Sequence, residues 1–387
     1  MINEKKRIFG LDLLRSIAII LVLVTHTVSF LDPQNHYYEI PVYTGYLGVE
    51  FFFVLSGFLI GTILLKIHYQ DTIINFKSIK LFWIRRWFRT LPNYYLMFLL
   101  YAALAYFVHH FIVFSHLKYL AYLVFLQNTI SYQPNDFFPV AWSLSIEEWF
   151  YLLFPLLLYL FSQIFPKNRS RSFFLTVIFF IIVELLIRIC IAVSQHNYWD
   201  EGFRKMMPIR LDSIAIGVLT AYVRLNLPQF WLRNVKKIAL LGIILMAGLT
   251  TYFTFDYVVH FSPLNWDHNL DAGLFLETLF FTLLSLSIAM FIPYLCSMKA
   301  QNGISGRVIT FVSKISYSIY LNHLLIILAL SRIFKHFANL NHSNIGLFAG
   351  IWVCTIVVSW FQYQFFELKM TALRNKFGRK KDVVNVT

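Results

Sequence analysis

A histidine lies far inside the first apolar stretch of the chain, and two charged residues share its side of the predicted helix. The stretch reads RIFGLDLLRSIAIILVLVTHTVSF and contains Asp12, Arg15 and His26. At 100° per residue, Arg15 and His26 are about 20° apart around a helix, and Asp12 lies about 40° to the other side of His26. Ionisable groups are costly inside a bilayer and usually mark a functional site there. The three residues therefore predict one wall of a polar path, with His26 about 16 Å deeper than Arg15 at ~1.5 Å per residue.

Three arginines occur close together in RRWFRTLP, residues 85–92. Arg86 and Arg89 are three residues apart and project to the same side of a helix, and Arg85 adds a third guanidinium group. Such a cluster is suited to bidentate binding of phosphates. The alternative is a basic anchor among lipid headgroups. Because the cluster ends at Pro92, which we expect to open the next helix, we favour a polyphosphate site, for example for the pyrophosphate of coenzyme A.

Two adjacent glutamates, Glu147 and Glu148, follow Trp142 and Ser143 at what we expect to be the outer mouth of another span. Adjacent residues point about 100° apart on a helix, so only one of the two should face a polar interior. That carboxylate could orient His26 and raise its basicity, or act as an acid–base group itself. The alternative is a pair of carboxylates in the headgroup region.

Further polar residues within or beside apolar stretches could reach the same interior, namely Glu50, Ser56, Arg210, Asp212 and His323. Ser56 precedes a glycine, and small residues more often permit close helix packing than catalysis. For His323, a structural hydrogen bond is an equally good interpretation. Glu184 and Arg188 are four residues apart, and we expect them to neutralise each other. No histidine falls in a zinc-binding spacing such as HExxH, so we predict no metal.

The elements that must position these residues are membrane helices. The chain of 387 residues is 58% hydrophobic and only 13% charged, and apolar runs of about 20 residues recur along it. This composition excludes a soluble enzyme. The net charge of +14 could suggest nucleic acid, but the basic residues fall in short clusters between apolar runs, as membrane topology requires. We expect helices near residues 10–30, 47–66, 92–114, 141–164, 173–194, 208–225, 238–258, 271–296, 309–331 and 345–366.

One apolar stretch, residues 116–128, is too short for a comfortable crossing. Counting it as a span would place the following basic cluster outside the cell, so we expect a re-entrant or tilted segment. Residues 67–91 carry Phe76, Ile79 and Trp83 at helical spacing among basic residues, which indicates a helix lying at the membrane interface.

The predicted fold is therefore an all-α, polytopic integral membrane bundle of about ten transmembrane helices plus one short re-entrant segment. We expect both termini to be cytoplasmic, because most basic residues then lie on the cytoplasmic side. We find no linker to a soluble domain. The prediction is one membrane domain over residues 1–387, with a transmembrane core at about 10–366 and a basic cytoplasmic tail at 367–387.

The chain resembles the acyltransferase-3 family, the bacterial membrane O-acyltransferases that modify surface glycans. The matching pieces are LDLLRSIAIILVLVTH, GVEFFFVLSGFLIG, IRRWFRTLP, AWSLSIEEWFYLLFP, RLDSIAIG and ISYSIYLNH. They occur in the family's order over nearly the whole chain. Each is modestly specific alone, and together they are strongly specific.

The resemblance implies a multi-pass protein of the bacterial inner or plasma membrane that moves an acyl group, most commonly acetyl, from acetyl-CoA to a hydroxyl of a surface glycan or glycolipid. It assigns the family's first-helix histidine to His26 and the accompanying arginine to Arg15. The family's cytoplasmic RxxR becomes Arg86 and Arg89, and its WSLxxE glutamate becomes Glu147. His26 would then be the general base, with Glu147 orienting it, or would carry the acyl group covalently. Asp12, on the same helix as His26, is the third catalytic candidate.

The chain departs from the family pattern in two respects, and both affect which family roles can be assigned to its residues. The family often has a proline shortly after an acidic residue at the end of the last helix, whereas Glu367 in QFFELKM has none nearby. Many relatives also continue into a soluble extracytoplasmic hydrolase-like domain. We therefore expect this membrane domain to acylate its acceptor directly or to pass the group to a separate extracytoplasmic protein.

The competing interpretation is a flippase or exporter of a glycan or glycolipid, in which the polar path carries cargo. A non-catalytic membrane sensor is a weaker third one. The arginine cluster favours the enzyme, because an exporter needs no dedicated cytoplasmic cofactor site.

Overall fold

The computed structural model describes residues 7–31, 45–70, 75–129, 137–194, 199–260, 273–301, 303–337 and 344–377. Within these ranges the chain is helical and contains no strand. Nine helices in the described ranges are long and apolar enough to cross a membrane. The predicted all-α polytopic bundle is thus confirmed, and the side on which each terminus lies stays a prediction. The last ten residues of the predicted basic tail lie outside the described ranges, as do residues 1–6.

The long helices follow the predicted order. They are α1 (Phe9–Thr27), α3 (Tyr46–Gln70), α4 (Phe76–His109), α6 (Ala141–Ile164), α7 (Arg169–Ser194), α8 (Leu211–Asn226), α10 (Val235–His260), α14 (Ile304–Phe337) and α15 (Ile345–Gln362). Of these, α8 has only 16 residues and is not among the nine candidate spans, and the ninth candidate is the segment Leu279–Ser297. The short helices that connect or continue them are η1 (Val28–Phe30), η3 (Val113–Ser115), α5 (Leu117–Leu120), η4 (Ala121–Val124), η5 (Trp199–Arg204), η6 (Met207–Ile209), α9 (Pro228–Arg233), α11 (Gly273–Glu277), α12 (Leu279–Ala289), α13 (Ile292–Ser297), η7 (Tyr363–Glu367) and α16 (Leu368–Phe377).

The segment around the arginine cluster differs from the prediction. The expected interfacial segment and the following span form one 34-residue helix, α4, with Pro92 inside it rather than at its start. A proline is tolerated within a membrane helix because neighbouring groups can satisfy the freed backbone. Asn75 caps the start of the helix, and its side chain accepts a hydrogen bond from the backbone of Ser78. The arginines are therefore held rigidly on the same helix as the span.

Two other segments are broken into short helices. Residues 116–128 hold only α5 and η4, in agreement with the prediction that this stretch is not a full crossing. The span expected at 271–296 is divided into α11, α12 and α13 within its described part. The first break is at Thr278, whose backbone is not helical, and Pro293 lies at the start of α13.

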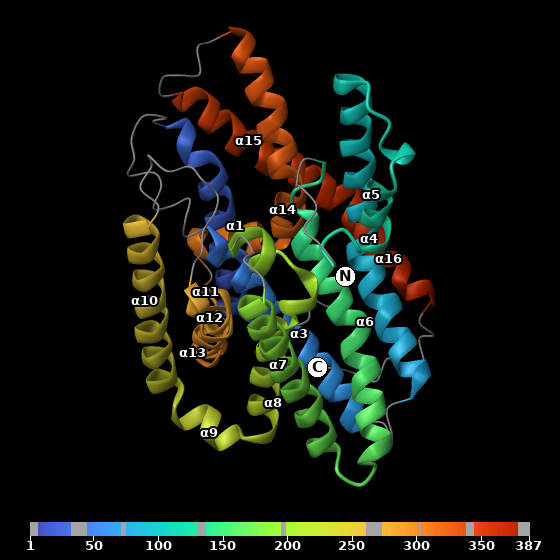
Figure 1. The fold of residues 1–387 in the computed structure, drawn as a ribbon, viewed down its shortest axis with the longest axis vertical. Coiled ribbons are helices and arrows are strands. Elements are labelled where there is room, and N and C mark those ends of the chain that lie inside the picture. The colour runs from blue at the N-terminus through green and yellow to red at the C-terminus, as the bar shows by residue number, and fades with distance from the viewer. Residues whose placement is uncertain are drawn as a thin grey trace.

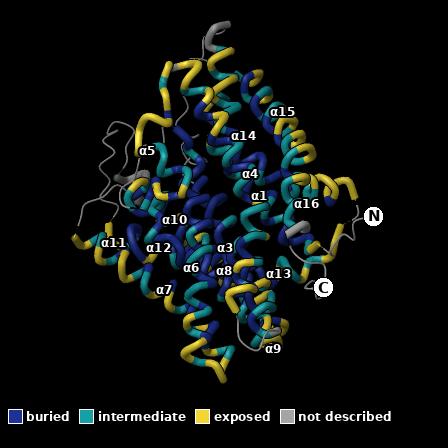
Figure 2. The backbone as a smooth tube through the Cα atoms, turned by 90° about the vertical axis from the view of Figure 1, so that its right-hand side faces the viewer, coloured by how far each residue is buried: buried dark blue, intermediate teal, exposed yellow. Residues whose placement is uncertain are grey.

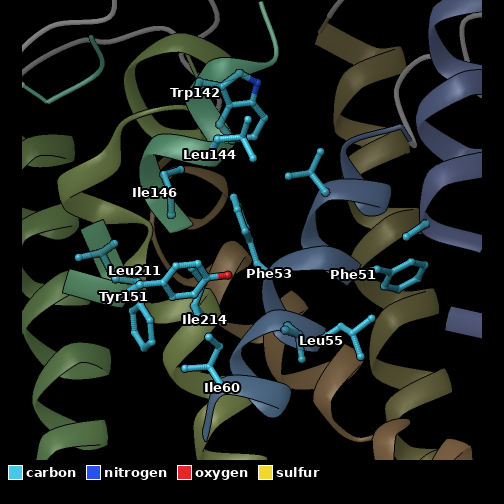
Figure 3. Packing of buried hydrophobic residues seen from close by; sticks show 14 of the residues in the cluster. Phe51, Phe53, Leu55, Ile60, Trp142, Leu144, Ile146, Tyr151, Leu211 and Ile214 are labelled. Atoms are coloured by element: carbon cyan, nitrogen blue, oxygen red, sulfur yellow. The ribbon is translucent and has the colours of Figure 1, made fainter. Parts of the chain in front are cut away.

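The helices surround α3, which is buried over most of its length (Figures 1 and 2). In Figure 2 the buried residues fill the centre, and exposed ones lie on the rim and at the ends of the helices. Figure 3 shows Phe53 and Ile60 of α3 among side chains of α6 and α8, whereas Leu55 and Phe51 lie on the other side of α3. The outward-facing residues are largely apolar, as expected for surfaces that contact lipid tails.

Helices α3 and α8 cross closely because glycines face each other there. A Cβ atom added to Gly57 would lie 1.9 Å from the carbonyl oxygen of Ile214, and one added to Gly217 would lie 2.1 Å from that of Val54. Membrane helices use such small residues to bring their backbones into contact. The sequence interpretation of the Ser56–Gly57 pair as a packing feature therefore holds for Gly57.

We expect Gly217→Val to destabilise the protein by about 2 kcal/mol or more, because the added side chain must push α3 and α8 apart. The measurement is the thermal unfolding midpoint of the purified protein in detergent. Gly248→Val is the matched control, since no atom lies within 4 Å of a Cβ added at that position. Equal midpoints for the two variants would contradict the close crossing.

Candidate active site

A cavity of about 120 Å³ lies between α1, α3, α4, α6 and α14, with one wall closed by η7. Its lining residues are Arg15, Val49, Phe52, Phe53, Leu55, Ser56, Leu59, Arg86, Arg89, Thr90, Ser143, Leu144, Glu147, Ser313, Lys314, Ser316, Tyr317, Tyr320 and Glu367. Six of these were candidates from the sequence: Arg15, Ser56, Arg86, Arg89, Ser143 and Glu147. Helices far apart along the chain thus bring the predicted arginines and one predicted glutamate to one place.

Basic side chains from three helices converge on this cavity. Arg15 comes from α1, Arg86 and Arg89 from α4, and Lys314 from α14. Arg15 donates a hydrogen bond to the hydroxyl of Ser313, 3.3 Å away. The third arginine of the predicted cluster, Arg85, is exposed and does not line the cavity. Arg85 was predicted to bind the phosphates together with Arg86, but adjacent residues point about 100° apart on a helix, so the two side chains face different directions.

A tyrosine that the sequence interpretation missed connects three helices of the site, α3, α4 and α6. The hydroxyl of Tyr151 lies 2.5 Å from that of Ser56, accepts from Arg86 at 2.8 Å and donates to Glu147 at 2.9 Å. The Arg86 guanidinium also lies 4.5 Å from the centroid of the Tyr151 ring. In Figure 3 the Tyr151 oxygen points toward the helix that carries Phe53, where Ser56 is located. The spacing of Glu147 and Tyr151, i and i+4 on one helix face, was the available signal.

The two adjacent glutamates have different surroundings. Glu147 lines the cavity, and Glu148 accepts a hydrogen bond from Thr90 at 2.6 Å. The prediction that Glu147 would orient His26 is not supported by the contacts. Among the described residues, its hydrogen bonds run to Tyr151 and thereby toward Arg86. Glu147 lies beside the arginines because α6 packs along α4 at this level.

A glutamate from the end of the chain also reaches the cavity. Glu367 is in η7, a short π-helical segment that follows α15. It accepts hydrogen bonds from Ser318 at 2.8 Å and from Asn93 at 3.1 Å. Single π-helical turns often occur at functional sites because they redirect one side chain. This placement was not predicted, because the proline that follows the acidic residue in the family pattern is missing after Glu367.

Asp12 does not line the cavity, although it shares a helix face with Arg15. Its carboxylate pairs with Arg7 at 2.5 Å and accepts a hydrogen bond from Ser313 at 2.7 Å. Arg15 is 3.6 Å from the same carboxylate. The predicted catalytic place of Asp12 is therefore corrected to a structural one, in which it joins the start of α1 to α14 and holds Arg15.

His26 lies at the far end of α1 and is not among the cavity-lining residues. It is exposed, and its Nδ1 atom is 2.8 Å from the carbonyl oxygen of Val22. The ring of His323 from α14 is 5.1 Å away, between centroids. On the cavity side, Tyr320 of the same helix lies 2.6 Å from Ser143 through their hydroxyls, and both residues line the cavity. Tyr320 thus joins the cavity wall to His323, and neither histidine lines the cavity.

Trp142 lies near the same end but outside the cavity. The guanidinium of Arg204, from η5, is 4.8 Å from its ring centroid. Arg204 and Lys205 both pair with Asp200. Burial raises the pKa of Asp200, but the charges of Arg204 and Lys205 outweigh it and lower the pKa to about 2. This carboxylate therefore stays ionised and fixes Arg204 over Trp142.

The remaining candidates form a second, separate polar network in the core. Glu50 pairs with Arg210 at 2.5 Å, and Asp212 pairs with Arg188 at 2.6 Å. None of these four residues lines the cavity. The predicted pairing of Glu184 with Arg188 is wrong, because Arg188 turns to the start of α8 and pairs with Asp212. Glu184 instead accepts a hydrogen bond from the backbone of Leu211 at 3.4 Å.

We expect Asp212→Asn to lower stability by about 3 kcal/mol, because it leaves the fully buried Arg188 without its counter-charge. The thermal unfolding midpoint in detergent measures the loss. Glu201→Gln removes one negative charge from an exposed position and serves as the matched control. If the unfolding midpoint of Asp212→Asn equals that of the control within error, the Asp212–Arg188 ion pair does not contribute this stability.

Comparison with known proteins places the chain in a family. The family model described as an acyltransferase domain matches residues 8–363. The relatives include "Putative O-acetyltransferase SACOL0978" of Staphylococcus aureus (strain COL), which is 28% identical over 339 residues, or 84% of this chain and 51% of that protein. They also include "O-acetyltransferase OatA" of Staphylococcus aureus (strain NCTC 8325 / PS 47), 29% identical over 330 residues, or 81% of this chain and 49% of that protein.

The chain spans about half the length of these curated relatives. No solved structure matches it. The family model nevertheless extends from the start of α1 to the start of η7, and so includes nearly all the helices that form the cavity. The chain is a multi-pass membrane protein that belongs to the acyltransferase-3 family.

Proposed function

We propose that this protein is a membrane O-acetyltransferase that moves an acetyl group from acetyl-CoA to a hydroxyl of a glycan or glycolipid on the other side of the membrane. The observation that carries the proposal is the meeting of Arg15, Arg86 and Arg89 in one cavity of an acyltransferase-family protein. The names of the relatives support O-acetylation in general.

The arginine end of the cavity suits the phosphates of coenzyme A. Guanidinium groups bind phosphate oxygens with paired, charge-assisted hydrogen bonds. Arg89 is exposed toward the cavity, and Arg86 is held in place by the Tyr151 hydroxyl. Glu147 and Glu367 bring negative charge to the same walls, so the site is not simply a positive surface. The donor would enter from the cytoplasmic side, where the basic segments are expected.

The histidine end suits proton transfer. Because Nδ1 of His26 lies against the Val22 carbonyl, the neutral ring carries its proton there and leaves Nε2 as the base. The acceptor oxygen attacks the thioester carbonyl, its proton passes to Nε2 of His26, and the carbon–sulfur bond breaks. The proton then goes to the departing thiolate of coenzyme A. The hydroxyls of Ser143 and Tyr320 line this end and share a hydrogen bond, and the Tyr320 hydroxyl would turn its proton to the oxyanion that develops.

The acceptor would approach His26 from the outer side, where the ring is exposed. A hydroxyl-bearing glycan or glycolipid fits this direction of approach, and a separate extracytoplasmic protein could take the acetyl group onward. Direct attack by the acceptor and a covalent acetyl-histidine both use the same nitrogen.

Mass spectrometry of surface glycans from cells with and without this chain tests the proposal. We expect base-labile acetyl esters on one glycan class only in cells that carry the chain. If instead the chain changes the amount of an unmodified glycan outside the cell and no ester appears, the protein is an exporter and the proposal is wrong.

A further inference from the structure

A second histidine lies directly beside His26 in the interior of the bundle. His323 is on α14, which runs alongside α1 (Figure 1), and its side chain is fully buried. The two imidazole rings are 5.1 Å apart between centroids and inclined by 62°. At this separation, ring nitrogens can come within hydrogen-bond distance after a small rotation of one ring.

The hydrogen bonds of His323 define which nitrogen carries its proton. Its Nδ1 atom lies 2.7 Å from the carbonyl oxygen of Tyr320 and 3.3 Å from that of Ile319. A carbonyl only accepts, so the neutral ring holds its proton on Nδ1 and has a lone pair on Nε2. This Nε2 atom is buried and has no hydrogen-bond partner among the described residues. A buried acceptor left unpaired is costly, and such an atom calls for an explanation.

His26 has the same arrangement, with Nδ1 against the Val22 carbonyl. Both neutral rings therefore present an acceptor nitrogen, and two acceptors cannot bond to each other. A hydrogen bond between them becomes possible once one ring gains a proton. His26 is the ring that gains one, because it is exposed to the acceptor while His323 is enclosed.

We propose that Nε2 of His323 accepts a hydrogen bond from Nε2–H of His26 after His26 has taken the proton of the acceptor hydroxyl. The inference rests on the proposed acetyltransferase function. In this step the O–H bond of the acceptor breaks and an N–H bond forms on His26. His323 shares that proton without keeping it, and it returns through His26 to the thiolate of coenzyme A. His323 is thus a positioning residue that stabilises the imidazolium form of His26.

The surroundings hold His323 in place for this task. Tyr320, one turn earlier on α14, has its ring centroid 5.8 Å from that of His323 and its hydroxyl on Ser143 of α6. Tyr320 also lines the cavity. His323 is therefore fixed between the cavity wall and His26, and its ring cannot turn away to find another donor without breaking the bond to the Tyr320 carbonyl.

Two replacements separate this role from a structural one. His323→Phe keeps a planar ring and removes the acceptor, whereas His323→Gln retains an acceptor oxygen. We expect kcat to fall about 10- to 100-fold in His323→Phe, with the KM for acetyl-CoA changed less than about twofold, because ground-state binding of the donor is untouched. We expect His323→Gln to recover a substantial part of the loss.

His68→Phe is the matched control. His68 is also a buried histidine, but it contacts Arg169 and Ser172 away from the cavity, so its replacement should leave kcat unchanged. Acetyl transfer is measured with wild type and His26→Ala in parallel, together with the unfolding midpoint of each protein.

The outcomes are distinct. A kcat loss in His323→Phe that His323→Gln restores supports the proposal. Wild-type rates in His323→Phe overturn it and leave the acetyltransferase function standing, provided that His26→Ala is inactive. Equal losses in both His323 variants, with lowered unfolding midpoints, assign the residue a packing role and also overturn it. A wild-type protein without acetyl transfer contradicts the proposed function and this inference together.

Discussion

His26→Ala is expected to lower the rate of acetyl transfer by about 10²- to 10⁴-fold, the usual contribution of a positioned general base. The physical reason is that Nε2 of His26 carries a free lone pair on an exposed ring, beyond the end of the cavity that Ser143 and Tyr320 line. The rate is measured as transfer of radiolabelled acetyl from acetyl-CoA into base-labile esters in membrane vesicles that contain the protein.

The fold should survive this change, because the His26 side chain is exposed and its described hydrogen bond runs to the backbone of its own helix. The unfolding midpoint should therefore stay close to that of the wild type. His110→Ala is the control, since this histidine lies at the end of α4 away from the cavity. Wild-type transfer by His26→Ala would remove the residue from the mechanism.

Arg86→Ala combined with Arg89→Ala is expected to weaken acetyl-CoA binding about 100-fold or more. Each charge-assisted hydrogen bond to a phosphate contributes about 1.5–3 kcal/mol, and both side chains line the cavity. The dissociation constant is measured by titration calorimetry on purified protein in detergent.

Arg85→Ala is the matched control for this binding experiment. It removes a guanidinium from the same turn of α4, but Arg85 is exposed outside the cavity. We expect its dissociation constant to stay within about threefold of the wild type, because an exposed charge acts only through screened, long-range attraction. If Arg85→Ala weakens binding as much as the double variant, the arginines form a diffuse basic surface and not a site.

Much of the fold could be predicted because membrane helices follow simple rules of length and hydrophobicity. The expected span at 141–164 coincides with α6, and that at 345–366 begins where α15 begins. The short stretch at 116–128 was excluded as a span by its length and by the side on which the following basic cluster would otherwise lie. The continuity of α4 was missed, since Pro92 was interpreted as a helix start and the neighbours that stabilise a proline within a helix cannot be identified from one sequence.

Only those features of the site that depend on the residue spacing within one helix could be predicted. Periodicity along one helix identified Arg86 and Arg89 as a pair and separated Glu147 from Glu148. Contacts between helices could not be predicted in this way, because they depend on how the helices pack in the bundle. Glu147 was therefore predicted to contact His26, although it lies beside Arg86. In the same way, Arg188 was predicted to pair with Glu184, although its partner is Asp212.

Residues that act through contacts between helices were the hardest to find. Tyr151 joins Ser56, Arg86 and Glu147, yet its position four residues after Glu147 was the signal in the sequence, and a tyrosine in an apolar helix carries no other. Glu367 reaches the cavity only because η7 departs from α-helical geometry, and a one-residue change of helical phase is not visible in the sequence.

The central claim is that the arginine cavity and His26 are two ends of one path for an acetyl group. Inside-out membrane vesicles test it most directly, because acetyl-CoA labelled in the acetyl group can be added to the cytoplasmic face. We predict base-labile label on glycan or lipid with the wild-type chain, and none above background with either His26→Ala or the Arg86→Ala, Arg89→Ala variant. Label that accumulates at the wild-type rate in either variant would contradict the claim.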